Sequence, residues 1–392
     1  MQQISSQTRV SRSLKPLTKY GSARAAIILI ASAVLLGACA GGGARPKPID
    51  LGANTPLLGV RQAWTHRVGE QPTGALPAVA GGTVVFTALD GTVAALDASK
   101  GIDVWRVSLG TALATGAGSD GRLAAVITRN NEVVAIDNGK EIWRTKLPAQ
   151  SFTAPLVAGG RVFALAADRS VTAFDGVSGR KLWVQQRPGE PLVLKQSGTL
   201  LAVGDTLVAG LSGRLVGINP NNGNIRWEAP IAAPRGTNEI ERLVDLVGRT
   251  SRVGEVVCAR AFQAAVGCVN AARGNLVWTK PANGAEGLSG DDRLVFGTEA
   301  DGHVVAWRRT DGERAWVVDR LQHRTLSAPL ALGRSVVFGD NSGNVHFLSR
   351  EDGSALNRLS TDSSGIVAGP VLAGDTLVVV TRNGGVYGYV AE

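Results

Sequence analysis

The sequence predicts an all-β fold, an eight-bladed β-propeller of four-stranded antiparallel blades. Tryptophans recur about every 40 residues, at spacings of 41, 38, 40, 44, 51 and 38, which indicates one supersecondary unit repeated along the chain. From the second of these tryptophans on, each lies four residues after a glycine. Short apolar segments separated by turn dipeptides fill the space between them, as expected for antiparallel strands. The seven tryptophans are Trp64, Trp105, Trp143, Trp183, Trp227, Trp278 and Trp316.

The first 38 residues have the features of a secretory signal. They carry five basic residues and no acidic residue, and the apolar run over residues 25–36 is too short to span a bilayer as a helix. The tetrapeptide LGAC at residues 36–39 resembles the bacterial lipobox, in which the cysteine is acylated and becomes the mature N-terminus. Ala40 stands where lipoproteins retained in the inner membrane have aspartate. This resemblance implies a lipid on Cys39 and the periplasmic side of the outer membrane.

Residues 39–56 are rich in glycine and proline, and we expect them to form a flexible tether between the lipid and a folded body at residues 57–392. The whole chain has a formal charge of +9, of which the signal contributes +5, so the mature protein carries about +4. Its basic residues are scattered over the repeats. A mildly cationic surface of this kind argues against nucleic-acid binding.

Each repeat contains four strands. In the copy at residues 77–105, a short apolar strand leads through a glycine turn to a β-branched strand, and the Asp90-Gly91 turn leads to a third strand. A further turn then leads to the strand that contains Trp105. The copies at residues 154–183 and 289–316 follow the same order. No segment after the signal sustains a helical period, so the chain is expected to consist of strands and turns.

The two ends of the repeat array complement each other. The last unit, residues 369–392, has three strands but ends before any tryptophan strand, whereas residues 57–68 contain a lone tryptophan strand. Joining them completes an eighth blade, closes the ring and removes exposed edges. A copy near residue 353 keeps the glycine but has Asn357 in place of tryptophan. The alternative, an open solenoid, would leave two raw edges and two orphan fragments.

The unit resembles the quinoprotein-type repeat, in which Ala-x-Asp-x-x-x-Gly-x-x-x-Trp is diagnostic. The segments from Ala95 to Trp105 and from Ala173 to Trp183 match this motif, and the resemblance covers residues 57–392. It implies that each tryptophan docks between neighbouring blades. It also raises an alternative function, a periplasmic dehydrogenase that uses pyrroloquinoline quinone and calcium.

The residues that such an enzyme needs are not found in the sequence. The chain has no vicinal cysteine pair, and its acidic residues mostly stand beside glycines, where carboxylates satisfy turn backbone. The four histidines do not have metal-ligand spacing. We therefore expect a non-enzymatic protein with no catalytic residue, no cofactor and no metal site. The histidines are His66, His303, His323 and His346.

Two cysteines remain after Cys39. If a two-residue turn falls at Gln263-Ala264, Cys258 lies opposite Val269 and Cys268 points to the other face of the sheet, which favours two separate buried residues. A shifted loop would remove that objection, and the oxidising periplasm permits a disulfide. The sequence leaves both possibilities open.

Function in repeat proteins is expected where the units depart from their consensus. One departure is the proline-interrupted run at residues 186–198, and the other is the long insertion near residues 230–250. With the lipobox, the tether and the cofactor-free ring, these segments resemble the two partner-facing segments of the outer-membrane protein assembly factor BamB family. The resemblance implies apolar contacts from Leu192 and Leu194, a cationic contact from Lys195 and an acidic one from Asp245.

Arg242, in the same insertion, is a further candidate contact residue. The family tends to have a second acidic residue two positions after Asp245, where this chain has Val247, so we expect this chain to lack part of the family's electrostatic contact. The partner implied by the resemblance is a POTRA domain of the barrel-inserting protein BamA, within the barrel-assembly (BAM) complex. We expect a scaffold lipoprotein that assists the insertion of outer-membrane proteins and holds their nascent strands. A glycan-binding propeller lipoprotein is a third possibility.

Overall fold

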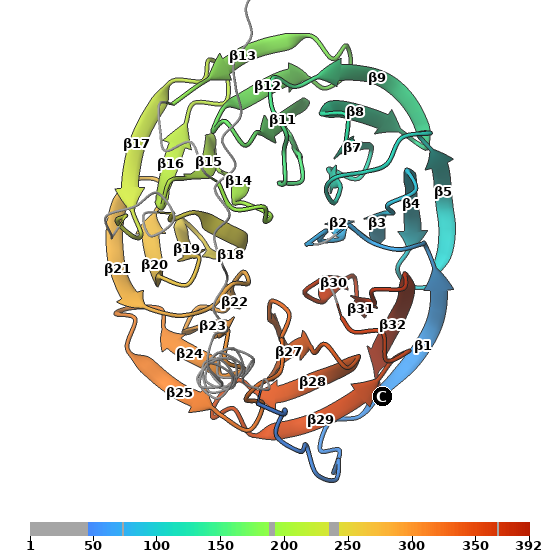
Figure 1. Ribbon diagram of the computed structural model, residues 1–392, viewed down its shortest axis with the longest axis vertical. Helices are drawn as coiled ribbons and strands as arrows, with labels where there is room; N and C mark the ends of the chain where they lie inside the picture. The colour runs from blue at the N-terminus through green and yellow to red at the C-terminus, as the bar shows by residue number, and fades with distance from the viewer. Residues whose placement is uncertain (1–45, 73, 188–192, 235–242, 367) are drawn as a thin grey trace, which may run out of the picture. The chain divides into compact units, whose positions relative to one another are not determined.

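The computed structural model describes residues 46–392, except residues 73, 188–192, 235–242 and 367. Within this part, Pro48–Glu392 is one compact unit of eight four-stranded antiparallel sheets arranged in a ring (Figure 1). The predicted eight-bladed all-β propeller is therefore confirmed. The predicted signal and Cys39 lie outside the described residues. No helix among the residues described has the length and apolar character needed to cross a membrane.

The blades are numbered one to eight from β2 onward, and each runs from an inner strand at the centre of the ring to an outer strand. Blade one contains β2 (Ala78–Ala80), β3 (Thr83–Thr87), β4 (Thr92–Asp97) and β5 (Ile102–Ser108). Blade two contains β6 (Gly118–Ser119), β7 (Leu123–Ile127), β8 (Glu132–Asp137) and β9 (Lys140–Lys146). Blade three contains β10 (Leu156–Ala158), β11 (Arg161–Leu165), β12 (Val171–Asp175) and β13 (Lys181–Gln185). Blade four contains β14 (Leu200–Val203), β15 (Thr206–Leu211), β16 (Arg214–Ile218) and β17 (Ile225–Pro230).

The second half of the ring follows the same plan. Blade five contains β18 (Leu246–Val253), β19 (Val256–Ala261), β20 (Ala265–Asn270) and β21 (Asn275–Pro281). Blade six contains β22 (Ser289–Gly290), β23 (Leu294–Thr298), β24 (Val304–Arg308) and β25 (Arg314–Val318). Blade seven contains β26 (Leu330–Leu332), β27 (Ser335–Gly339), β28 (Asn344–Ser349) and β29 (Ala355–Ser360). Blade eight contains β30 (Val371–Ala373), β31 (Thr376–Val380), β32 (Gly385–Ala391) and β1 (Val60–Arg67).

Blade eight closes the ring as the sequence predicts. Its outer strand β1 comes from the N-terminal side of the array and pairs antiparallel with β32, so that Trp64 lies opposite Gly388. The pairing satisfies the backbone groups that an open array would leave at its two ends. The solenoid alternative is therefore wrong.

The tryptophans dock on the neighbouring blades, and the glycines make room for them. At the boundary of blades two and three, Trp143 Nε1 donates to Gly176 O at 2.9 Å. Gly179, at the end of the same turn, has a φ of +70°, and a Cβ placed there would lie 2.6 Å from the Trp143 ring. Glycine is therefore needed for both its left-handed backbone and its missing side chain. This explains why glycine precedes each repeat tryptophan and packs on the tryptophan of the preceding blade.

The two cysteines of blade five form a disulfide, and the expected register was wrong. The hairpin between β19 and β20 pairs Ala261 with Ala265, so its loop has three residues and not two. The middle loop residue, Gln263, adopts a left-handed φ of +47°, which the longer turn requires. The extra loop residue shifts the register by one position and places Cys258 directly opposite Cys268.

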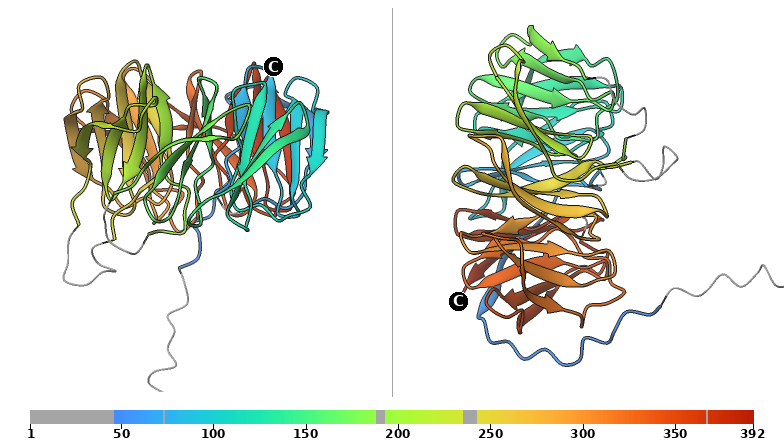
Figure 2. Two further views of the ribbon diagram at one scale, coloured as in Figure 1. Left: turned by 90° about the horizontal axis from the view of Figure 1, so that it is seen from above. Right: turned by 90° about the vertical axis from the view of Figure 1, so that its left-hand side faces the viewer.

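The ring has two distinct faces, which can be followed edge-on in Figure 2. One face carries the turns between the third and fourth strands of each blade, such as residues 98–101; we call it the turn face. The opposite face carries the connections from each outer strand to the next inner strand, such as residues 109–117; we call it the connection face. Because strands alternate in direction, the turns between second and third strands also lie on the connection face.

Candidate partner-binding site

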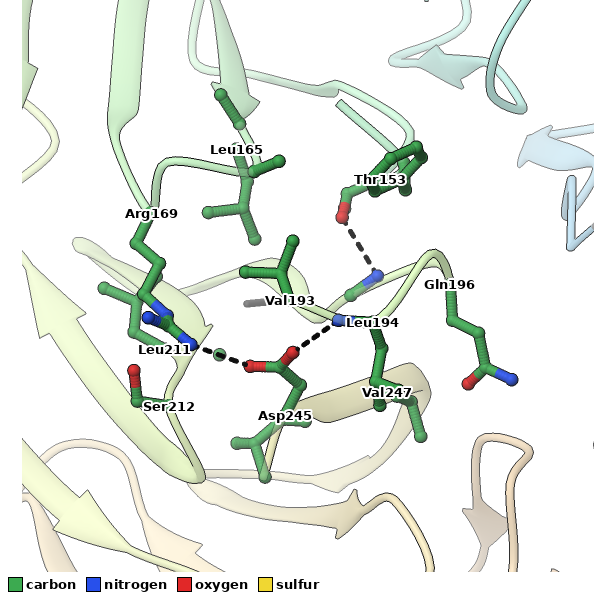
Figure 3. Close-up of a pocket in the computed structure, with 16 residues that line it drawn as sticks. Thr153, Leu165, Arg169, Val193, Leu194, Gln196, Leu211, Ser212, Asp245 and Val247 are labelled. Carbon is green, nitrogen blue, oxygen red and sulfur yellow. Dashed lines mark hydrogen bonds and ion pairs between the residues drawn. The ribbon is translucent and has the colours of Figure 1, made fainter. Parts of the chain in front are cut away.

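A pocket on the connection face lies where blades three, four and five meet (Figure 3). The connection between β13 and β14 enters it with Val193 and Leu194, and the segment leading into β18 supplies Asp245. Apolar walls come from the ends of second strands, with Leu165 at the end of β11 and Leu211 at the end of β15. The two irregular segments singled out in the sequence therefore meet at one place.

A hydrogen bond joins these segments directly. The backbone N–H of Leu194 donates to Asp245 Oδ2 at 2.9 Å. A guanidinium nitrogen of Arg169 lies 3.7 Å from the other carboxylate oxygen, Oδ1. The Asp245 side chain is 17% exposed and that of Arg169 only 6%, so the ion pair is shielded from solvent. The carboxylate therefore bonds inward and holds the Leu194 backbone in place.

A second set of backbone contacts supports this arrangement further along both segments. Gly198 N donates to the Thr153 hydroxyl at 2.9 Å, and Gly198 forms an isolated β-bridge with Val247. Gly248 N donates to Ser197 O at 2.8 Å. The β13–β14 connection is thus held between blade three and blade five, and its position depends on both.

Arg169 is a site residue that the sequence analysis missed. It occupies the turn position that Gly91 and Gly302 fill in blades one and six, with a φ of +63° where those glycines have +95° and +92°. A non-glycine residue in this region is uncommon and points to a local constraint. An arginine in the pair Asp168-Arg169, where blades one and six have Asp-Gly and blade two has Asn130-Asn131, was the signal that could have identified it.

The predicted contact residues differ in how far they are exposed to solvent. Leu194 is half-buried and Lys195 is exposed beside it, so the pair presents an apolar and a cationic group at the rim of the pocket. Val247, where the family tends to have an acidic residue, is only 2% exposed and packs in the wall of the pocket. Leu192 and Arg242 lie outside the described residues.

The centre of the ring is crossed by an arginine. Arg249, on the inner strand β18, donates to Pro329 O at 2.8 Å, and its guanidinium also reaches Pro370 O at 3.5 Å. These carbonyls precede the inner strands of blades seven and eight. Burial lowers the pKa of Arg249 to about 10, which still leaves the side chain charged at neutral pH. In the part of the chain that the structure describes, no three His, Cys, Asp or Glu side chains gather as metal ligands would.

Comparison with known proteins finds relatives over nearly the whole chain. The family model described as "Outer membrane protein assembly factor BamB" matches residues 60–107, 89–318 and 311–392. The protein of that name from Burkholderia pseudomallei is 39% identical over 371 residues, which cover 93% of this chain and 97% of the relative.

Two solved structures show the same fold. BamB from Moraxella catarrhalis matches with a TM-score of 0.77 at 21% identity, covering 84% of this chain and 99% of that one. Quinohemoprotein alcohol dehydrogenase from Comamonas testosteroni matches with a TM-score of 0.64 at 15% identity, covering 84% of this chain and 76% of that one. At these identities the likeness concerns the fold alone, which an assembly factor and an enzyme share.

Proposed function

Since the chain belongs to the family of the outer membrane protein assembly factor BamB, we propose that it is a non-enzymatic scaffold of the BAM complex. In this proposal a lipid on Cys39 anchors it in the outer membrane, and the residues from Cys39 to Pro48, where the compact unit begins, tether the propeller on the periplasmic side. The ring binds a POTRA domain of BamA and contacts other BAM subunits. It thereby assists the assembly and insertion of β-barrel proteins and holds nascent outer-membrane proteins near the insertase.

The observation that carries the proposal is the junction of the two irregular connections. The bond from Leu194 N to Asp245 joins residues that are 51 positions apart and leaves Lys195 exposed next to a half-buried leucine. An apolar residue surrounded by polar rim groups is typical of the centre of a protein interface. Leu192 and Arg242 remain proposed contact residues and lie outside the described part of the chain.

The contacts of Asp245 support a positioning role for this residue in place of the direct acidic contact first expected. A carboxylate that accepts from Leu194 N and pairs with Arg169 is mostly shielded from a partner. We assign it the positioning of the Leu194–Lys195 segment, with the direct contacts made by Leu192, Leu194 and Lys195. Removing the carboxylate leaves a buried arginine without this counter-charge and frees the segment, so binding should weaken without loss of a direct contact.

Capture of BamA from detergent-solubilised envelope tests the proposal. The wild-type protein should retain BamA, and Leu192→Ala/Leu194→Ala/Asp245→Ala should retain at least about tenfold less, the effect of losing roughly 1.4 kcal/mol of binding energy. Val177→Ala is the matched control, because Val177 is 77% exposed and lies on the turn face. Equal capture by the triple variant would overturn the site, and no capture by the wild type would overturn the function.

Titration with the purified POTRA domains distinguishes the contact role of Lys195 from the positioning role of Asp245. Lys195→Ala removes an exposed cation, so its effect on binding should shrink as salt increases. Asp245→Asn keeps the shape but removes the charge that faces Arg169, so its effect should persist at high salt. The same salt dependence for both variants would contradict the assigned roles.

A further inference from the structure

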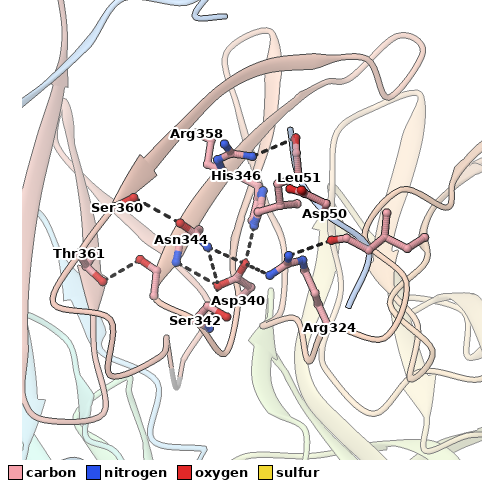
Figure 4. Close-up of polar contacts among 12 residues, drawn as sticks. Asp50, Leu51, Arg324, Asp340, Ser342, Asn344, His346, Arg358, Ser360 and Thr361 are labelled. Carbon is pink, nitrogen blue, oxygen red and sulfur yellow. Dashed lines mark hydrogen bonds and ion pairs between the residues drawn. The ribbon is translucent and has the colours of Figure 1, made fainter. Parts of the chain in front are cut away.

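The segment Ile49–Leu58, which precedes β1, is bound along blades six and seven (Figure 4). We call this segment the strap. Its backbone carbonyls accept hydrogen bonds from four side chains of these blades. The bonds are Arg324 to Ile49 O (2.9 Å), Arg358 to Leu51 O (3.2 Å) and Gly52 O (2.8 Å), Arg334 to Leu57 O (2.7 Å), and Asn357 to Leu58 O (2.8 Å).

The surface that receives the strap is built into blade seven. Arg324 lies 3.4 Å from Asp340 Oδ2, and the same carboxylate oxygen is 2.9 Å from His346 Nε2 (Figure 4). Asp340 is completely buried and also accepts from the backbone N–H of Asn344 at 3.0 Å. The guanidinium that binds Ile49 O is therefore positioned by a buried network. Charge-assisted bonds held in this way are stronger than bonds made by mobile surface side chains.

Apolar contacts fix the two ends of the strap. Leu51 packs against the hydrophobic cluster between blades six and seven, against which Trp316 also packs. Leu58 packs against the cluster between blades seven and eight. Asn54 adds a hydrogen bond to Arg358 O at 2.9 Å in between. The strap thus spans blade seven, from its boundary with blade six to its boundary with blade eight.

The strap takes the chain from one face of the ring to the other. Leu57 N donates to Leu356 O near the start of β29, on the turn-face side. Ile49 N donates to Gln322 O, which lies in the connection between β25 and β26 on the connection face. Figure 2 shows the blue N-terminal segment leaving the ring on this side in both views. The chain therefore leaves the ring on the face that carries Val193–Lys195 and Asp245.

We propose that the strap determines which face of the ring is turned towards the lipid bilayer and how far the ring can move away from it. The inference depends on the proposed lipid at Cys39. With the strap bound, nine residues connect Cys39 to Pro48, so the exit point stays within about 32 Å of the anchor. Release up to Val60 would leave 21 residues and allow about 75 Å. The connection face, with its candidate partner site, is thus held towards the membrane.

Energy transfer in vesicles tests this orientation. The full-length acylated protein is bound to vesicles of phosphatidylethanolamine and phosphatidylglycerol that contain an acceptor dye in the headgroup region. A donor dye is placed on Lys195→Cys, on the connection face, or on Val177→Cys, on the turn face; Cys258 and Cys268 are unreactive in their disulfide. Transfer should be about twofold greater from position 195, because strands of about six residues separate the faces by about 20 Å. Equal transfer from both positions would overturn the proposal.

Two variants should release the strap, one by changing residues of the ring and the other by changing residues of the strap itself. Arg324→Ala/Arg358→Ala removes the donors on the ring, and Leu51→Ser/Asn54→Ala leaves blade seven intact and so covers a failure of the first variant to fold. Both should bring the ratio of transfer close to one and accelerate hydrogen exchange at Ile49 N and Leu57 N by at least about tenfold. Arg308→Ala/Arg314→Ala removes the same charge from blade six away from the strap and should leave the ratio unchanged.

The readouts distinguish a failed anchor from a failed strap. Protein that does not bind vesicles and carries no acyl mass on Cys39 would overturn the proposed anchor, whatever the strap does. Vesicle-bound protein whose Ile49 and Leu57 amides exchange freely in the wild type would overturn the strap alone. A ratio that survives strap release would show that something other than the strap orients the ring, and would likewise overturn the inference.

Discussion

The boundary between blades six and seven and the boundary between blades seven and eight have different residues at the same position. At the first, Trp316 Nε1 donates to Arg350 O at 2.9 Å, in the turn between β28 and β29. At the second, Asn357 stands in the tryptophan position, and its Nδ2 donates to Leu58 O at 2.8 Å. The matching turn of blade eight does not exist, because its third and fourth strands come from opposite ends of the chain.

This difference shows what the repeat tryptophan requires. The indole ring packs on a glycine in the closed turn of the next blade, as Trp316 packs on Gly353. Where the turn is replaced by the incoming strap, a short amide provides the same N–H donor without the bulk of an indole. The missing tryptophan therefore belongs to the closure of the ring and is not a degenerate repeat.

The largest loss of stability is expected at the boundary of blades six and seven, which has the regular tryptophan. Trp316→Ala should lower the free energy of unfolding by about 3–5 kcal/mol, because it empties the space between two blades and removes the ring N–H donor. Urea unfolding followed by circular dichroism measures this change. Leu51 packs at the same boundary, so the variant should also loosen the strap. A loss below about 1 kcal/mol would contradict the assignment of the tryptophans to blade packing.

Blade seven also offers a test that depends on pH. Burial alone would raise the pKa of Asp340, but hydrogen bonds from His346 and Asn344 outweigh it and lower the pKa from 3.8 to about 2. A lowered pKa in the folded state contributes stability above pH 4 that is lost as the pH falls from about 4 to 2. Two pKa units correspond to about 2–3 kcal/mol, which Asp340→Asn should lose at pH 7.

The pH profile identifies the cause. The wild type should lose stability between pH 4 and 2, and the Asp340→Asn curve should be flatter over that range by about the same 2 kcal/mol. Glu351→Gln is the control in the same blade, because that side chain is 65% exposed and pairs with Arg293 at the surface. Parallel curves for the wild type and Asp340→Asn would show that the buried network does not supply this stability.

The sequence predicts features that depend on residues close together in the chain better than features that depend on distant residues. The blades, the closing strand and the role of the tryptophans depend on a period and on local turn dipeptides, and these predictions are confirmed. The assignment to an assembly-factor family, as opposed to a dehydrogenase, is confirmed by the relatives. The register of the cysteines was wrong because one extra loop residue, Phe262, has no distinctive sequence signal.

The parts that could not be predicted depend on contacts between distant residues. Ile49 and Gln322 meet across 273 positions, and no local pattern marks a segment rich in small and polar residues as a docked strap. Arg169 reaches Asp245 only because blades three and five meet at the connection face. Leu194 and Asp245 became candidates through the resemblance, which did not predict the hydrogen bond between them.

The smallest loss of stability is expected at the boundary of blades seven and eight, where Asn357 replaces the tryptophan. Asn357→Ala removes the hydrogen bond to Leu58 O and the two that its Oδ1 accepts from Asn54 and from Arg358 N, at a cost of about 1 kcal/mol, because the strap keeps its arginine contacts. Thermal unfolding should show a small decrease in melting temperature, and hydrogen exchange should increase at Leu57 N more than at Ile49 N. Asn357→Trp is the sharper test. If the absent turn explains the asparagine, the indole has no glycine surface to lie on and must displace Leu58, so this variant should be less stable than Asn357→Ala. A stabilising tryptophan would instead mean that the strap boundary accepts the regular packing of the repeat.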